Sequence, residues 1–216
     1  MAEGHSSGTL EVTVVSPARP IFEGEAKFVT APAWDRVGGH RSLYGGAPKE
    51  HAAYGIEFPD VAERVARLEE AVAVIRALWT GGPVTRPSPY YPLVDAHAFP
   101  VPTPPPPIII GGETPAGARL AARIGDGWST FENNFVQNMP LYLEALEAAG
   151  RRREDQRVYA GFQGYWLGDE SVAETEWCRE PRAAWERWHD IGADGAIVLA
   201  RTTADVDALV DAVSRW

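Results

Sequence analysis

The chain has 216 residues, of which 45% are hydrophobic and 23% charged, and its formal net charge is -10. This acidic balance argues against nucleic-acid or anionic-membrane partners, because phosphate-rich surfaces bind basic proteins. The single cysteine, Cys178, excludes an intramolecular disulfide and a thiolate-rich metal site. The sequence has neither an apolar run near the ~20 residues of a membrane span nor a secretory signal pattern, so it predicts a cytoplasmic protein.

The first elements along the chain are predicted to be a β-hairpin and a long helix. Residues 10–31 contain two strands of alternating apolar and polar side chains, separated by a turn. The helix spans residues 60–79, where Asp60 and Glu63 form a capping box and apolar residues recur every three or four positions. Residues 69–70 are adjacent glutamates in this helix, and we expect both to be solvated because neighbouring helical side chains diverge.

The most informative segment is a strand, a glycine turn and a helix in the middle of the chain. Residues 108–110 are three isoleucines bounded by proline and glycine, which is typical of a strand buried on both faces of a parallel sheet. Gly111 and Gly112 then let the backbone turn and approach a ligand. Thr114 is predicted as the N-cap and Pro115 as the first helical residue. A helix that begins here offers free amides to an anion, although a Gly-Gly pair also serves as a plain tight connection.

The rest of the chain repeats the order of strand and then helix. Together with residues 108–110 it provides four βα units, which is half of a (β/α)8 barrel and too few to close one. We therefore expect strand 108–110 to lie at an exposed or self-associating sheet edge, and the chain to form a homo-oligomer. The further predicted strands are residues 127–131, 157–167 and 195–200, and the further helices are residues 138–149, 170–190 and 202–216.

Four motifs carry a family resemblance. In chain order they are Glu50-His51 with Tyr54-Gly55, and the segments 64–79, 104–112 and 122–128. Together they resemble the luciferase-like monooxygenase family, especially its members that use the deazaflavin coenzyme F420. The resemblance covers residues 45–216 and implies a partial TIM barrel made of the last four βα units. It also implies a flavin- or F420-dependent oxidoreductase acting on a small organic substrate, with coenzyme F420 or FMN at the carboxyl mouth of the barrel.

The resemblance also assigns a cofactor site. By it, Gly111, Gly112, Thr114 and Pro115 correspond to the turn that contacts the coenzyme phosphate, at the strand end where a barrel places its site. The family's acid/base and hydride-transfer residues are expected before the family-like part of this chain, where the sequence does not show them. We therefore name no catalytic residue and expect an incomplete and inactive copy. His51 is interpreted as structural or surface, and no histidine stands at metal-ligand spacing, so we predict no metal site.

The N-terminal segment resembles a different protein. Residues 14–17 and 22–26 are similar to the start of the epsilon subunit of the rotary ATP synthase, whose N-terminal domain is a β-sandwich. The sequence is thus divided into a β-hairpin segment, residues 1–36, and a luciferase-like half barrel, residues 45–216. Two other hypotheses stay open beside the oxidoreductase. One is a non-catalytic interaction module or remnant, and the other is a fragment related to the ATP synthase epsilon subunit.

Overall fold

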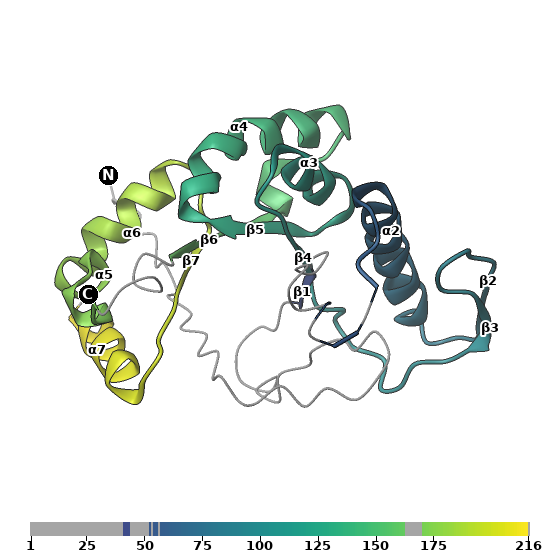
Figure 1. The fold of residues 1–216 in the computed structure, drawn as a ribbon, viewed down its shortest axis with the longest axis horizontal. Coiled ribbons are helices and arrows are strands. Elements are labelled where there is room, and N and C mark those ends of the chain that lie inside the picture. The colour runs from purple at the N-terminus through teal and green to yellow at the C-terminus, as the bar shows by residue number, and fades with distance from the viewer. Residues whose placement is uncertain (1–40, 44–51, 53, 56, 163–169, 216) are drawn as a thin grey trace, which may run out of the picture. The chain divides into compact units, whose positions relative to one another are not determined.

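The computed structural model describes residues 41–43, 52, 54–55, 57–162 and 170–215, which form an α/β fold (Figure 1). The chain divides into two compact units. Of the described residues, the first unit holds Thr130–Gln137 and the stretch from residue 157 onward, and the second unit holds the others. The hairpin predicted over residues 10–31 lies outside the described residues, and so does His51.

The second unit is built on three parallel strands, β1 (Arg41–Leu43), β4 (Ile108–Gly111) and the start of β5 (Gly127–Phe131). Strand β4 lies between the other two, because Ile109 pairs with Ser42 on one side and with β5 on the other. The prediction that residues 108–110 form a sheet edge is therefore wrong. The partner that was missed is β1, a three-residue Arg-Ser-Leu strand without the β-branched run that indicates a strand in sequence.

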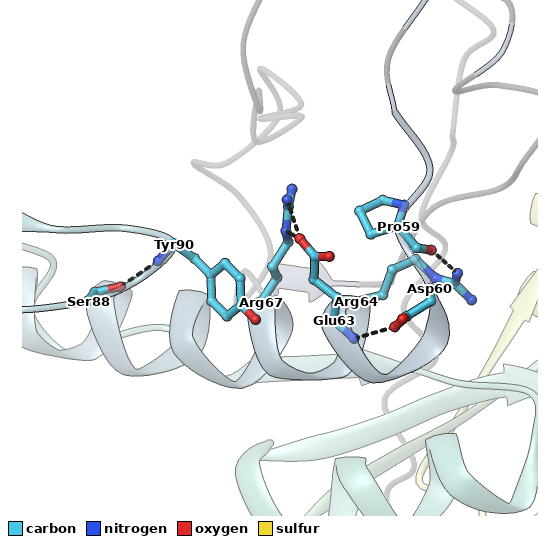
Figure 2. A network of polar contacts seen from close by, with 7 residues as sticks. All are labelled: Pro59, Asp60, Glu63, Arg64, Arg67, Ser88 and Tyr90. Carbon is cyan, nitrogen blue, oxygen red and sulfur yellow. Dashed lines mark hydrogen bonds and ion pairs between the residues drawn. The ribbon is translucent and has the colours of Figure 1, made fainter.

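Helix α2 (Val61–Leu78) begins where the capping pattern predicts. The Asp60 carboxylate accepts the Glu63 N–H at 2.9 Å, and the Glu63 carboxylate in turn accepts Arg67 Nε at 2.8 Å (Figure 2). The Arg67 guanidinium lies 5.5 Å from the centroid of the Tyr90 ring. This network joins the first turns of α2 to the loop that contains Tyr90.

The segment between α2 and β4 contains an antiparallel pair of strands, β2 (Val84–Arg86) and β3 (Leu93–Ala96), which the sequence analysis does not predict. Ser88 Oγ organises the connecting turn by accepting the N–H groups of Tyr90 and Tyr91 at 3.1 and 2.7 Å. Prolines lie close to both strands and weaken the strand pattern in the sequence.

The two adjacent glutamates of α2 have partly buried surroundings. Glu69 forms an ion pair with Arg123 of α3 (Pro115–Ile124). Glu70 Oε2 is buried and has no hydrogen-bond partner in the part of the chain that the structure describes. The expectation of a solvated side chain is therefore wrong for Glu70, whereas the Glu69 side chain is 40% exposed.

In the first unit, β6 (Arg157–Phe162) and β7 (Gly195–Val198) run parallel. The Phe162 ring centroid lies 4.4 Å from that of Trp177 and 4.8 Å from that of Trp188, so aromatic packing closes the side of β6 that faces the helices. The helical elements of this unit are η3 (Val172–Glu174), α5 (Glu176–Arg179), α6 (Pro181–Asp190) and α7 (Thr203–Ser214).

The four predicted βα units are present, so the chain forms a partial (β/α)8 barrel. Helix α4 (Glu132–Ala148) begins at residue 132 rather than 138, directly after β5, because Phe135, Met139, Tyr142 and Leu146 extend one buried face. A short 3-10 turn, η1, covers Arg153–Asp155. Among the described helices, none is long and apolar enough to cross a lipid bilayer.

Candidate functional site: the glycine turn before helix α3

The four residues predicted to contact a coenzyme phosphate lie together at the carboxyl end of β4. Gly111 ends the strand, Gly112 follows it, Thr114 is the N-cap of α3, and Pro115 is the first helical residue. In parallel β/α folds this edge of the sheet is where ligands bind. The local sequence pattern therefore placed these residues correctly with respect to one another.

Hydrogen bonds within the second unit hold the backbone of this turn. The Gly112 N–H donates to the Ser129 carbonyl at 3.0 Å, and the Gly112 carbonyl accepts the Trp128 indole N–H at 2.8 Å. The Glu113 carbonyl accepts Asn138 Nδ2 at 3.1 Å, and the Asn138 side chain is buried. Trp128 and Asn138 thus support the turn, although no sequence pattern indicates their contacts with it.

Gly112 is required by packing. A Cβ at Gly112 would lie 2.9 Å from both Cα and the carbonyl carbon of Gly117, in the first turns of α3. Gly112 is not among the glycines with positive φ. The sequence analysis attributes the glycine pair to the approach of a ligand, whereas in the structure the close neighbour of Gly112 is its own helix. This packing holds the start of α3 against the end of β4.

The first turn of α3 leaves a backbone donor for an external acceptor. Thr114 Oγ1 accepts the Gly117 N–H at 3.1 Å, and the Thr114 carbonyl accepts the Ala118 N–H at 2.9 Å. Pro115 has no N–H, and the Ala116 amide makes no hydrogen bond within the described ranges. The first turn contains no acidic residue. Its dipole and the exposed amide suit an anion.

The corresponding helix start after β7, in the first unit, is closed by the protein itself. The buried Asp205 carboxylate accepts the N–H groups of Arg201 and Thr202 at 2.8 and 3.0 Å. Burial raises the pKa of Asp205, but the hydrogen bonds from Arg201, Thr202 and Val172 outweigh it, so this pKa lies below its usual value. A carboxylate therefore already occupies the place where an anion would bind.

Two aspartates fix the opposite, amino-terminal ends of the strands. Asp126 Oδ2 accepts the Ile108 N–H at 2.9 Å, and the Asp126 N–H donates to the Ile108 carbonyl at 2.7 Å. Asp194 makes the same two bonds to Val158 in the first unit, each at 2.8 Å. Both aspartates thus hold strand ends in place.

Within the described residues, no group of three or more His, Cys, Asp or Glu side chains could hold a metal ion.

Two related proteins match part of this chain. An F420-dependent glucose-6-phosphate dehydrogenase from Microbacterium testaceum is 38% identical over 106 residues, which cover 47% of this chain and 32% of the relative. A protein of the same name from Kribbella flavida is 39% identical over 116 residues, which cover 51% and 35%. The chain therefore spans about a third of the length of these curated relatives.

A solved structure supports the fold, and a family model identifies the family. A monooxygenase from Streptomyces bottropensis shares 21% identity at a TM-score of 0.59, over 81% of this chain and 65% of that protein. The model of the luciferase-like monooxygenase family matches residues 44–209. The resemblance of residues 8–35 to the ATP synthase epsilon subunit stays a prediction. Because the family match covers most of the sequence, this chain belongs to the luciferase-like monooxygenase family.

Proposed function

We propose that the chain binds coenzyme F420, or FMN, by its phosphate at the glycine turn, as the coenzyme-binding part of an oxidoreductase that transfers hydride between that coenzyme and a small organic substrate. The observation that carries the proposal is the open, acid-free first turn of α3 at the carboxyl end of β4. Membership of the luciferase-like family and the F420-dependent relatives support the choice of coenzyme. When bound, the coenzyme ring would supply the hydride chemistry.

The residues of the turn fit a phosphate group. The Ala116 amide and the positive end of the α3 dipole would hold the anion, while the Thr114 hydroxyl lies at the same helix start. Gly112 and Gly117 keep this start close to the end of β4, because neither has a side chain to separate them. The chain's own part in the reaction is thus to bind and orient the coenzyme.

The charge around the turn favours F420 over FMN. The Glu113 carboxylate is adjacent to the N-cap, and the turn from Gly111 to Pro115 carries no basic residue. A phosphomonoester such as FMN carries close to two negative charges at neutral pH, whereas the phosphodiester of F420 carries one. Fewer negative charges are easier to place beside a carboxylate.

A charge placed at the N-cap tests this proposal. Thr114→Asp keeps a good N-cap but adds a carboxylate where the phosphate would bind, and Thr114→Asn is the matched uncharged control. Fluorescence titration with F420 should show affinity at least ~10-fold weaker for Thr114→Asp, equivalent to ~1.4 kcal/mol, and little change for Thr114→Asn. Circular dichroism should show that both variants are folded.

The same titration separates the competing hypotheses. F420 binding by the parent chain that disappears in Thr114→Asp supports the coenzyme site, and an assay of F420 reduction with candidate alcohols then tests the oxidoreductase role. A parent chain that binds neither F420 nor FMN would instead favour the non-catalytic interaction module. Equal affinity of both Thr114 variants would show that the phosphate lies elsewhere.

We also propose that the chain self-associates. Val94 of β3 and Phe99 are 80% and 75% exposed, and large apolar side chains at such exposure are typical of contact surfaces when they cluster. Sedimentation velocity at micromolar concentration should show a dimer or larger species. A compact monomer over that concentration range would contradict this proposal.

A further inference from the structure

The last residue of β5 is an aromatic side chain that lies against a glycine of β6. A Cβ at Gly161 would be 3.1 Å from Cδ1 and 3.4 Å from Cε1 of the Phe131 ring, so the missing side chain makes the space in which the ring rests. Phe131 is only partly buried. It therefore leaves an apolar surface at the carboxyl end of the strand, which is the end where barrel enzymes bind their substrates.

The next residue, Glu132, has a carboxyl group for which the described part of the chain provides no partner. It is the first residue of α4 and is partly buried, and it makes no hydrogen bond or ion pair in the part of the chain that the structure describes. Glu176, a carboxylate of the same unit, is paired with Arg187. Among residues 41–43, 52, 54–55, 57–162 and 170–215, no cation pairs with Glu132, although its side chain is partly buried.

The environment of Glu132 makes its negative charge costly. A carboxylate in the first turn of a helix is normally stabilised by the helix dipole, which lowers its pKa. Here burial, and then the charge of Glu176, raise the pKa of Glu132. Burial and the neighbouring carboxylate therefore outweigh the dipole. Perturbed carboxyl groups at the ends of barrel strands are frequent at functional sites.

An apolar ring that ends a strand, followed directly in the chain by a partly buried carboxyl, suits a particular class of ligand. The Phe131 ring can contact an apolar body, and Glu132 can accept a hydrogen bond from a hydroxyl group. A phosphoryl dianion at the same place would meet a partly desolvated like charge, which is strongly unfavourable. The pair therefore discriminates between ligands by charge as well as by shape.

We propose that Phe131 and Glu132 form a specificity element that selects uncharged, partly apolar alcohols and rejects phosphorylated sugars. This inference rests on the proposed oxidoreductase function. It separates the chain from its relatives named glucose-6-phosphate dehydrogenases, because a substrate phosphate would be repelled here.

The experiment measures the binding of two probes, cyclohexanol and glucose 6-phosphate, by saturation-transfer NMR. The variants are Glu132→Lys, which reverses the charge, and Phe131→Leu, which removes the ring but keeps an apolar side chain. Glu186→Lys, on the exposed face of α6, is the control because it changes the net charge of the chain by the same amount. Each protein is measured with and without coenzyme F420.

The parent chain should bind cyclohexanol. It should show no binding of glucose 6-phosphate up to about 10 mM, so its dissociation constant for glucose 6-phosphate should exceed about 10 mM. Glu132→Lys should strengthen binding of glucose 6-phosphate at least ~10-fold over Glu186→Lys, and Phe131→Leu should weaken binding of cyclohexanol about threefold. The coenzyme titration of the same samples reports separately on the proposed function.

Three results would overturn this specificity element. One is a parent chain that binds glucose 6-phosphate more tightly than cyclohexanol, or that binds neither probe. Another is an equal response of Glu132→Lys and Glu186→Lys. The third is unchanged cyclohexanol affinity in Phe131→Leu. Failure to bind F420, with the probe selectivity intact in the coenzyme-free sample, would count against the proposed function alone.

Discussion

Two connections of this chain share one plan but differ in what they leave for a ligand. After β4 and after β7, a threonine caps the following helix, Thr114 for α3 and Thr202 for α7. In α7 the Asp205 carboxylate completes a capping box, accepts the N–H groups of Arg201 and Thr202, and places a negative charge in the first turn. In α3 no acidic residue stands in the first turn. A carboxylate in the first turn thus opposes an external anion at α7, whereas the first turn of α3 carries no such charge.

Gly112→Val should break the open connection with the largest effect. The new side chain would begin 2.9 Å from the backbone of Gly117, and backbone atoms cannot move aside as the end of a side chain can. We expect the free energy of unfolding to fall by about 3 kcal/mol in urea denaturation. Gly82→Val is the control, because a Cβ there meets no atom within 4 Å. Equal losses for the two variants would show that the contact with Gly117 carries no special weight.

Asp205→Asn should damage the closed connection, by about 2 kcal/mol, because a buried charged acceptor of backbone amides is lost. The pKa of Asp205 is lowered on folding, so its contribution is present above the unfolded carboxyl pKa and is lost as the pH falls through the folded value. Urea denaturation between pH 3 and 7 should show a weaker pH dependence for Asp205→Asn than for the exposed control Asp207→Asn. The same pH dependence in both would contradict this role.

Substitutions of the two aspartates at the amino-terminal strand ends should change the free energy of unfolding least, and by nearly equal amounts. Asp126 and Asp194 make the same pair of bonds to a strand end, so replacing either with alanine should cost about 1–2 kcal/mol. Asp126 also pairs with Arg76, but both side chains are more than a third exposed, so this adds about 0.5 kcal/mol or less. Thermal and urea denaturation of the two variants check the comparison. A difference above ~2 kcal/mol between the two variants would show that Asp126 and Asp194 do not stabilise their strand ends equally.

The sequence predicted those elements whose signals are local. The bounds of α3 match the prediction because Thr114, Pro115 and Gly125 are all capping signals, and β5 matches because glycine opens it. Strand β1 was missed because three ordinary residues form a strand only through their pairing with β4. The β2–β3 pair was not predicted because nearby prolines weaken its strand pattern. The start of α4 was predicted too late because its first turn is polar in sequence.

The candidate site also has features that the sequence predicts and features that it does not. Gly111, Gly112, Thr114 and Pro115 could be placed together from the sequence, since they are neighbours in the chain. The packing that requires a glycine at position 112 could not be predicted, because it depends on how α3 folds back against the turn. The contacts of Trp128, Asn138 and the Phe131 ring depend on side-chain directions from neighbouring elements, which no periodicity encodes.

The comparison between the open and the closed helix start can be tested most directly by NMR. Addition of coenzyme F420 to the 15N-labelled chain should shift the amide resonances of Thr114 and Ala116 in a saturable way, because their N–H groups lie where the phosphate would bind. The resonances of Thr203 and Ala204 at the start of α7 should not change. Unchanged Thr114 and Ala116 resonances, or equal shifts at α7, would contradict the account.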